Sequence, residues 1–121
     1  MSTARPGTRR SPCPVAATLD LIGDRWTLLI IRDLLSGKSR YQELADSPEG
    51  IATNILAARL ERLRACGLVV AKSSSQRAGS SEYHLTPRGR SLLSVLEVMR
   101  DWGLAHVPGT SAKVRVTTGA R

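Results

Sequence analysis

The feature that most constrains this chain is residues 50–89, where a helical pattern is followed at once by two short strand patterns. Spacings of four and three residues define the buried side of the helix, which carries Leu56, Leu60 and Leu63. Gly67 then acts as a C-terminal stop, and Thr86-Pro87 caps a new helix after the strands. A helix followed directly by a β-hairpin is typical of a winged helix-turn-helix, whose usual partner is duplex DNA.

Hydrophobic periodicity predicts helices for most of the remaining chain. The expected helices cover residues 14–22, 25–35, 40–45, 52–66 and 87–105, and the expected strands cover 68–73 and 81–85. Residues 1–11 read as a disordered basic arm, 12–106 as one domain and 107–121 as a flexible basic tail. The predicted fold class is α+β, mainly α: a winged helix-turn-helix with additional N- and C-terminal dimerisation helices, because the terminal helices carry surplus apolar surface.

Composition supports a small helical core and weakens any argument from charge alone. Hydrophobic residues make up 41% of the 121 residues, while aromatic residues make up 3% and Phe is absent, so aliphatic side chains must build the core. The formal net charge is +8, but six basic residues lie in the acid-free ends 1–14 and 107–121, which leaves +2 for residues 15–106. The high pI is therefore modest evidence for nucleic-acid binding.

Several classes of protein are disfavoured by the residues present. Two cysteines make no disulfide framework, and no apolar run is long enough for a signal core or a membrane span, so a cytoplasmic location is expected. Soft metal ligands do not occur at zinc-site spacing, so we expect no metal and no cofactor. No phosphate loop or nucleophile–base pairing indicates an enzyme. The acids at the first helices, Asp20, Asp24 and Asp33, fit helix caps or solvated faces.

The helix over 52–66 carries the candidate DNA contacts. With the leucines inward, its outward early positions are Thr53, Asn54, Ala57 and Ala58. Small residues let the helix approach base edges, Asn54 can pair with adenine, and Thr53 can reach a base or a phosphate. Further along, Arg59, Arg62 and Arg64 could hold phosphates, and Arg40 on the preceding short helix is a further candidate DNA contact. The alternative is an ordinary surface helix with a solvated arginine face; the attached hairpin favours DNA.

Two further residues are candidates for function. Arg77, near the tip of the 74–80 connection, could enter a minor groove, where the potential is most negative, or could be an ordinary solvated loop residue. Cys13 lies between two prolines at a helix start, where unpaired N–H groups favour a thiolate and the nearby Arg9 and Arg10 add to the effect. Cys13 is thus a candidate redox or electrophile sensor, and the alternative is a small apolar residue packed at an interface.

The chain resembles the HxlR-type transcriptional regulators, a bacterial branch of the MarR-like winged-helix group. The resemblance spans roughly residues 12–105 and is carried by Cys13-Pro14-Val15 with residues 19–23, by residues 25–34, by Gly50-Ile51 with Leu56, Arg59-Leu60 and Gly67-Leu68-Val69, and by Glu82-Tyr83 with Leu85-Thr86 and residues 89–92.

The resemblance implies a homodimer through the first and last helices, with the helix near 52–66 in the major groove and the hairpin on flanking DNA. Arg59 matches the conserved arginine of the family's recognition helix. Ala52 and Ala57 depart from the usual cap and hydroxyl residues, which indicates a different operator sequence. Some members of the family sense oxidants through a cysteine that matches Cys13.

These observations predict a sequence-specific regulator that binds an inverted-repeat DNA operator as a homodimer and is not an enzyme. The alternative from a different class is a winged-helix protein-interaction module whose basic tails bind nucleic acid without sequence preference. A third possibility is a ligand-gated regulator with a pocket between the dimer helices, lined by Trp26 and Trp102, although both tryptophans fit a core role better. The residues predict neither a particular operator sequence nor a particular small-molecule or oxidant effector.

Overall fold

The structure is a computed structural model that describes residues 9–73 and 80–111. Its elements in chain order are α1 (Pro14–Ile22), α2 (Thr27–Leu35), α3 (Tyr41–Ala45), α4 (Thr53–Ala65), β1 (Val69–Ser73), β2 (Ser81–Leu85), α5 (Pro87–Arg90) and α6 (Leu93–His106). Helices with one β-hairpin confirm the predicted α+β winged helix-turn-helix. Most of the predicted arm and tail, and most of the predicted hairpin connection with Arg77, lie outside the described residues.

Two helices differ from their predicted extents, for local reasons. The helix predicted over 25–35 begins at Thr27, because the Asp24 carboxylate accepts the N–H groups of Trp26 and Thr27 at 3.0 and 3.2 Å. The helix predicted over 87–105 is broken into α5 and α6. At the break, the N–H of Leu92 donates to the carbonyl of Gly89, three residues back, and this tighter turn separates the two helices.

The core lies where α2, α3 and α4 meet the base of the hairpin. Ile31 of α2 and Leu56 of α4 are fully buried, which makes these two helices its centre. The buried hydrophobic residues form one cluster of aliphatic side chains and one thiol: Ile22, Ile30, Ile31, Leu34, Leu35, Leu44, Ile51, Leu56, Leu60, Leu63, Cys66, Leu68, Val69, Leu85 and Leu96. Burial of this apolar surface is the main favourable term in folding.

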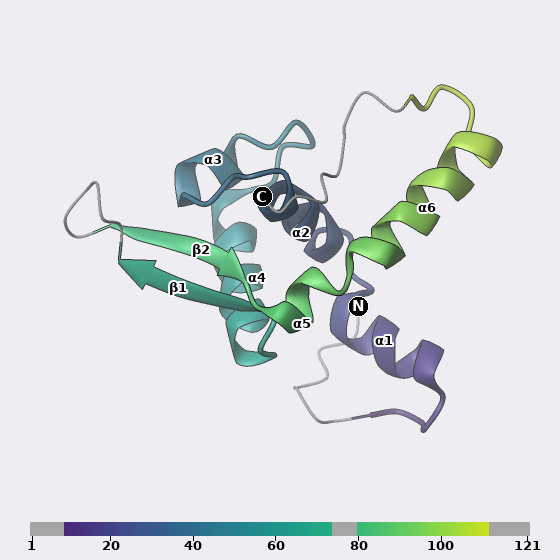
Figure 1. Ribbon diagram of the computed structural model, residues 1–121, viewed down its shortest axis with the longest axis horizontal. Coiled ribbons are helices and arrows are strands. Elements are labelled where there is room, and N and C mark those ends of the chain that lie inside the picture. The colour runs from purple at the N-terminus through teal and green to yellow at the C-terminus, as the bar shows by residue number, and fades with distance from the viewer. Residues whose placement is uncertain (1–8, 74–79, 112–121) are drawn as a thin grey trace.

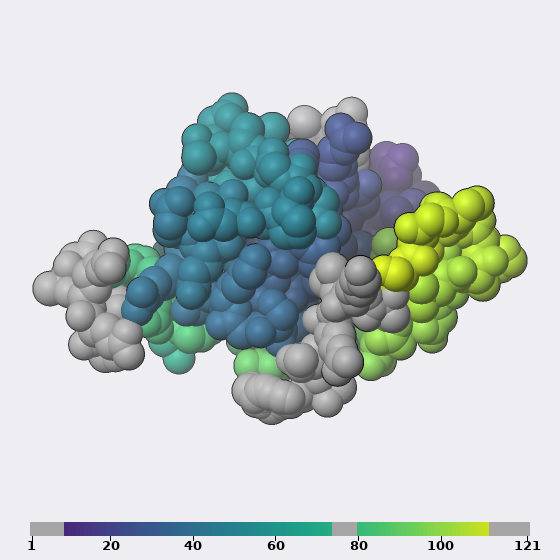
Figure 2. Space-filling model, turned by 90° about the horizontal axis from the view of Figure 1, so that it is seen from above, coloured from purple at the N-terminus to yellow at the C-terminus, as the bar shows by residue number. Residues whose placement is uncertain are grey.

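The hairpin and the last helix extend from opposite ends of this core (Figure 1). The space-filling view shows α6 as a flank of its own beside the body formed by the middle of the chain (Figure 2). In the ranges that the structure describes, no helix is both long and apolar enough to cross a membrane.

The hairpin is held against the helix-turn-helix by backbone hydrogen bonds. β1 and β2 pair antiparallel, from Val69 opposite Leu85 to Ser73 opposite Ser81. On the other edge of β2, the N–H of Tyr83 donates to the carbonyl of Ser39 at 2.7 Å, and Arg40 forms an isolated bridge with Glu82. The chain entering α3 therefore acts as a short third strand, which places α3 and the hairpin in a defined relation to each other.

Candidate nucleic-acid interface

Helix α4 buries one face and exposes the face that the sequence predicted. Its leucines at 56, 60 and 63 are at most 2% exposed, whereas the opposite side of its N-terminal half is exposed to solvent. The exposed positions of that half are Thr53, Asn54, Ala57 and Ala58. Ala52 is the N-cap residue and makes no side-chain cap hydrogen bond, so the first N–H groups of α4 are not capped by it.

Two contacts fix the start of α4. The Tyr41 hydroxyl of α3 donates to the carbonyl of Thr53 at 2.8 Å, which ties the two helices together. Before α4, the Glu49 carboxylate accepts two hydrogen bonds from Arg32 of α2, and Ser47 also donates to it. The Arg32 hydrogen bonds lower the pKa of Glu49 to about 2, so this carboxylate is charged at neutral pH. The turn between α3 and α4 is thereby anchored to the central helix.

The start of α3 borders a polar hollow beside the hairpin. Glu43 accepts the N–H groups of Ser39 and Arg40 at 2.9 and 3.0 Å, and these bonds hold the pKa of Glu43 below its ordinary value. The hollow has a volume of about 380 Å³, and its lining carries hydroxyl, amide and guanidinium groups but no carboxylate: Arg40, Tyr41, Gln42, Ser80, Ser81 and Tyr83. A lining of this kind is compatible with an anionic group such as a DNA phosphate.

Arg59 and Arg62 lie on α4 but point toward the α1–α2 junction. The Arg59 Nε donates to Asp24 Oδ2 at 2.7 Å, and an Arg62 terminal nitrogen donates to the backbone carbonyl of Asp20. Both arginines are half-buried. Their predicted contact with phosphate stays a prediction, and in this structure both guanidinium groups are engaged with the protein itself.

The acids at the first two helices have roles that the sequence did not reveal. Asp24 does cap a helix, as predicted, but Asp20 and Asp33 are 6% and 5% exposed, so their assignment to caps or solvated faces was wrong. Asp20 accepts the Nε of Arg10 at 2.6 Å, and Asp33 accepts Arg32 at 2.9 Å. The contacts that Asp24 and Asp20 make with α4 join residues 35 and 42 positions apart in the chain, so no local spacing could signal them.

The terminal helices carry a large exposed apolar surface. Val15 and Leu19 of α1 are 67% and 50% exposed. On α6 and just after it, the exposed hydrophobic residues are Val98, Met99, Trp102, Leu104 and Val107. Trp102 is 62% exposed, and its ring centroid lies 4.8 Å from that of His106 with the two rings tilted, so the expectation that it lies in the core was wrong for this chain. Exposed apolar patches of this kind mark interaction surfaces.

The two cysteines differ in accessibility. Cys13 is exposed and is the N-cap residue of α1, whereas Cys66 is buried in the core cluster. Over residues 9–73 and 80–111, no group of three or more His, Cys, Asp or Glu side chains could hold a metal ion.

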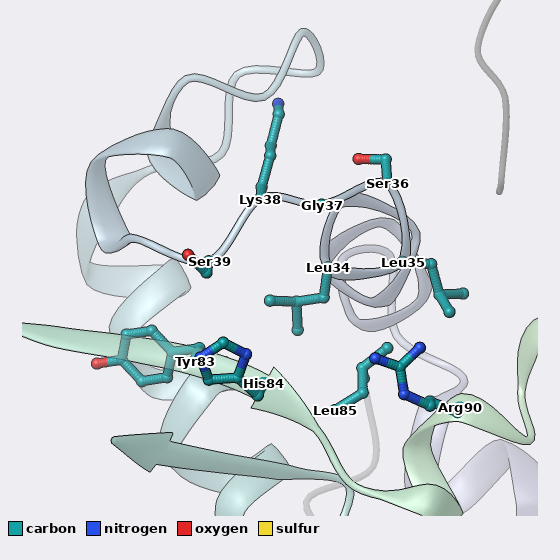
Figure 3. A pocket seen from close by; sticks show the side chains of 10 residues that line it. All are labelled: Leu34, Leu35, Ser36, Gly37, Lys38, Ser39, Tyr83, His84, Leu85 and Arg90. Carbon is teal, nitrogen blue, oxygen red and sulfur yellow. The ribbon is translucent and has the colours of Figure 1, made fainter. Parts of the chain in front are cut away.

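Two further cavities lie away from the exposed face of α4. One, of about 450 Å³, lies between the end of α2, the loop after it, and β2, with Arg90 of α5 at its edge; Figure 3 shows Lys38 pointing away from it. The other, of about 370 Å³, lies between α2 and α6 and is lined mainly by Leu29, Leu96, Met99 and Leu104. Neither Trp26 nor Trp102 lines the second cavity, which lies within one subunit; the tryptophan-lined pocket between the helices of a dimer stays a prediction.

Comparison with known proteins gives one consistent result. A family model described as HxlR-like helix-turn-helix matches residues 21–111. The uncharacterized HTH-type transcriptional regulator sll1512 of Synechocystis sp. is 31% identical over 107 residues, which are 88% of this chain and 79% of that protein. The family and the relative that the present chain matches are thus described as transcriptional regulators, not as enzymes.

Solved structures agree with the sequence comparisons. The crystal structure of PA1607, a candidate transcription factor, shares 42% sequence identity with a TM-score of 0.76 over 84% of this chain and 72% of that one. The redox regulator HypR in its oxidized form shares 33% identity with a TM-score of 0.70 over 78% of this chain and 97% of that one. The chain therefore belongs to the HxlR-like helix-turn-helix family of DNA-binding transcriptional regulators.

Proposed function

We propose that this protein regulates transcription in the cytoplasm by binding an inverted-repeat operator as a homodimer. Residues 12–106 form the binding domain, in which α4 enters the major groove and the hairpin lies on flanking DNA. Two recognition helices of a dimer then read half-sites about one helical turn, ~34 Å, apart.

The observation that carries the proposal is the exposed N-terminal half of α4. Ala57 and Ala58 give this face a low profile, so the helix backbone can come close to base edges. Asn54 can exchange two hydrogen bonds with adenine, and Thr53 can contact a base or a phosphate. Arg40 beside the polar hollow, and Arg77 on the hairpin, supply cations for the DNA backbone or the minor groove.

The dimer is supported by the exposed apolar side chains of α1 and α6. A monomer that leaves Val15, Val98 and Trp102 each more than 60% exposed has unburied apolar surface that a second copy could cover. α1 and α6 both lie on the side of the molecule away from the hairpin (Figure 1), so two copies could meet there and still present both hairpins to DNA.

The first test is selection of fragmented bacterial genomic DNA on the purified, reduced protein at physiological salt. Enrichment of a few inverted repeats supports the proposal and identifies the operator. Uniform retention contradicts it and favours the interaction module. In that case, removal of residues 1–11 and 108–121 should abolish binding, whereas a sequence-specific regulator should retain its operator preference without those residues.

A second candidate function is oxidant or electrophile sensing through Cys13. It is favoured by the exposure of this thiol at the start of α1 and by the 33% identity with HypR, which is described as a redox regulator. Because α1 belongs to the proposed dimer interface, a modification at Cys13 could change the relative placement of the two recognition helices.

A further inference from the structure

Four residues connect the recognition helix to the junction between α1 and α2. We call them the junction clasp: Asp20, Asp24, Arg59 and Arg62. Arg59 of α4 donates to the Asp24 carboxylate at 2.7 Å, and Arg62, about one turn further along, donates to the backbone carbonyl of Asp20 near the end of α1. Both contacts come from the same helix and reach the same short stretch of chain.

The acceptor for Arg59, the Asp24 carboxylate, is held by further hydrogen bonds. Asp24 also accepts the N–H groups of Trp26 and Thr27 and the Thr27 hydroxyl, and its side chain is 11% exposed. Burial alone would raise the pKa of Asp24, but the hydrogen bonds from Thr27, Arg59 and Trp26 outweigh burial and keep the pKa below its ordinary value. The carboxylate that caps α2 thus also fixes Arg59.

Each guanidinium group of the clasp is partly buried and has a nitrogen bonded at the α1–α2 junction. The Arg59 side chain is 28% exposed, against 49% for Arg64 on the same helix, and its Nε points at Asp24. The exposed face of α4, with Asn54 and Ala58, looks to solvent. To contact a DNA phosphate through Nε, Arg59 would have to break its charge-assisted bond to Asp24 and leave this largely buried carboxylate without a charged partner, which is costly.

We propose that Arg59 and Arg62 are positioning residues, which set the orientation of α4 relative to α1, and that they are not phosphate ligands. The inference rests on the proposed function, since it concerns how the dimer reads its operator. α1 carries exposed Val15 and Leu19 at the proposed dimer surface. The clasp therefore links the dimer helix to the recognition helix, and in a dimer it fixes the separation of the two recognition helices.

Asp24→Asn is the decisive variant. If Arg59 is a phosphate ligand, this variant should bind DNA more tightly than the wild type; if Arg59 is a positioning residue, it should bind less tightly. Asn is as good a helix cap as Asp, so α2 keeps its start, while the partner of Arg59 loses its charge. If Arg59 served phosphates, removing a nearby negative charge would strengthen DNA binding. The clasp predicts about tenfold weaker binding to the selected operator, a typical size for coupling between two sites.

The salt dependence of binding gives a second measurement. Loss of one phosphate contact lowers the slope of log K against log salt concentration by ~0.9. The clasp predicts that Arg59→Ala weakens operator binding with an unchanged slope and leaves binding to an unrelated duplex unaltered. Arg64→Ala, an exposed arginine of the same helix paired only at 3.4 Å with Glu61, is the control for removing a charge from α4. Its operator affinity should change less than that of Arg59→Ala.

A third measurement separates positioning from simple loss of stability. Operators with one base pair added between the half-sites are compared with the selected operator. Because the clasp fixes helix separation, the wild-type protein should lose more affinity on the added base pair than Asp24→Asn does. Thermal unfolding of each variant verifies that it is folded at the temperature of the binding experiment. If Arg59→Ala is unfolded there, Asp24→Asn alone is used for the test.

Failure of the junction clasp and failure of the proposed function give different results in these experiments. Tighter operator binding by Asp24→Asn, or a slope reduced by ~0.9 in Arg59→Ala, overturns the clasp while the regulator stands. An equal spacer penalty in the wild type and Asp24→Asn also overturns it. Failure of the wild-type protein to select any inverted repeat overturns the proposed function, and the inference with it.

Discussion

Arg32 and Glu49 form a bidentate ion pair, in which both terminal nitrogens of the guanidinium donate to the carboxylate, each at 2.8 Å. Arg32 lies on the central helix α2, and Glu49 lies in the turn of the helix-turn-helix. The same guanidinium also binds Asp33 and Ser47, so its charge is shared among three partners. This bidentate pair gives the turn before the recognition helix one geometry relative to the core.

The pair predicts a loss of stability in acid. Folding lowers the pKa of Glu49 from 4.5 to about 2, so the stabilisation is complete above pH 4.5 and is lost as the pH falls toward 2. The free energy of unfolding of Glu49→Gln should fall less steeply than that of the wild type over this range, as measured by urea unfolding. Glu61→Gln, at an exposed side chain, should follow the wild-type curve. Parallel curves for the wild type and Glu49→Gln would contradict the prediction.

Gly89 is predicted to be intolerant of any side chain. A Cβ there would lie 2.2 Å from the carbonyl oxygen of Leu68 and 2.9 Å from a methyl group of Leu85, so α5 would have to move off the hairpin. Gly89→Ala should lower the free energy of unfolding by ~2 kcal/mol in chemical denaturation. Gly103→Ala is the matched control on α6: among the described residues, nothing beyond the adjacent helix backbone and chain neighbours lies within 4 Å of a Cβ placed there, and alanine should stabilise the helix by up to ~1 kcal/mol. Equal effects at both positions would show that the contact with Leu68 is relaxed at little cost.

Asn54 is predicted to set base preference. It is exposed on the first turn of α4, where a bidentate contact with adenine contributes ~1–3 kcal/mol of discrimination. Asn54→Ala should therefore bind the selected operator less tightly and should retain a different or broader set of sequences when the genomic selection is repeated. An unchanged affinity and an unchanged sequence preference would show that the recognition face lies elsewhere on α4.

The apolar face of α6 is predicted to hold the dimer together. Val98→Glu places a charge on a side chain that is 67% exposed in the monomer, and burying that charge in an interface is costly. Light scattering after size exclusion should report a monomer for Val98→Glu and a dimer for the wild type. Val70→Glu introduces the same charge on the hairpin and should remain dimeric. A wild-type monomer, or a dimer that survives Val98→Glu, would refute this interface.

Cys13 is predicted to be the residue that responds to oxidant, if the protein senses one. Oxidant should lower the operator affinity of the wild type, and Cys13→Ser should bind equally well before and after treatment. Cys66→Ser should keep the wild-type response, because Cys66 is 6% exposed and belongs to the core. A response that persists in Cys13→Ser would assign sensing to another group.

The sequence alone determined the elements and the outward face of α4. Leu56, Leu60 and Leu63 repeat at helical spacing, and Gly67 ends the helix, so both signals are local and could be read without a structure. The same periodicity placed Asn54 and Ala58 on the opposite face, and the structure exposes both. The break between α5 and α6 was missed: the turn there is closed by the N–H of Leu92 on the carbonyl of Gly89, and Gly89 lies against the carbonyl of Leu68, which is distant in the chain.

Only the tertiary structure decided which helix faces are buried in the core and which charged side chains pair with one another. Periodicity shows that a helix side is apolar but not whether this chain covers it, so Trp102 could be taken for a core residue although it is 62% exposed. The ion pair of Arg59 with Asp24 joins residues far apart in the chain, and the order of charged residues along the sequence does not predict which of them will pair. Side-chain type and spacing are local properties, whereas burial and pairing arise only once the helices have packed.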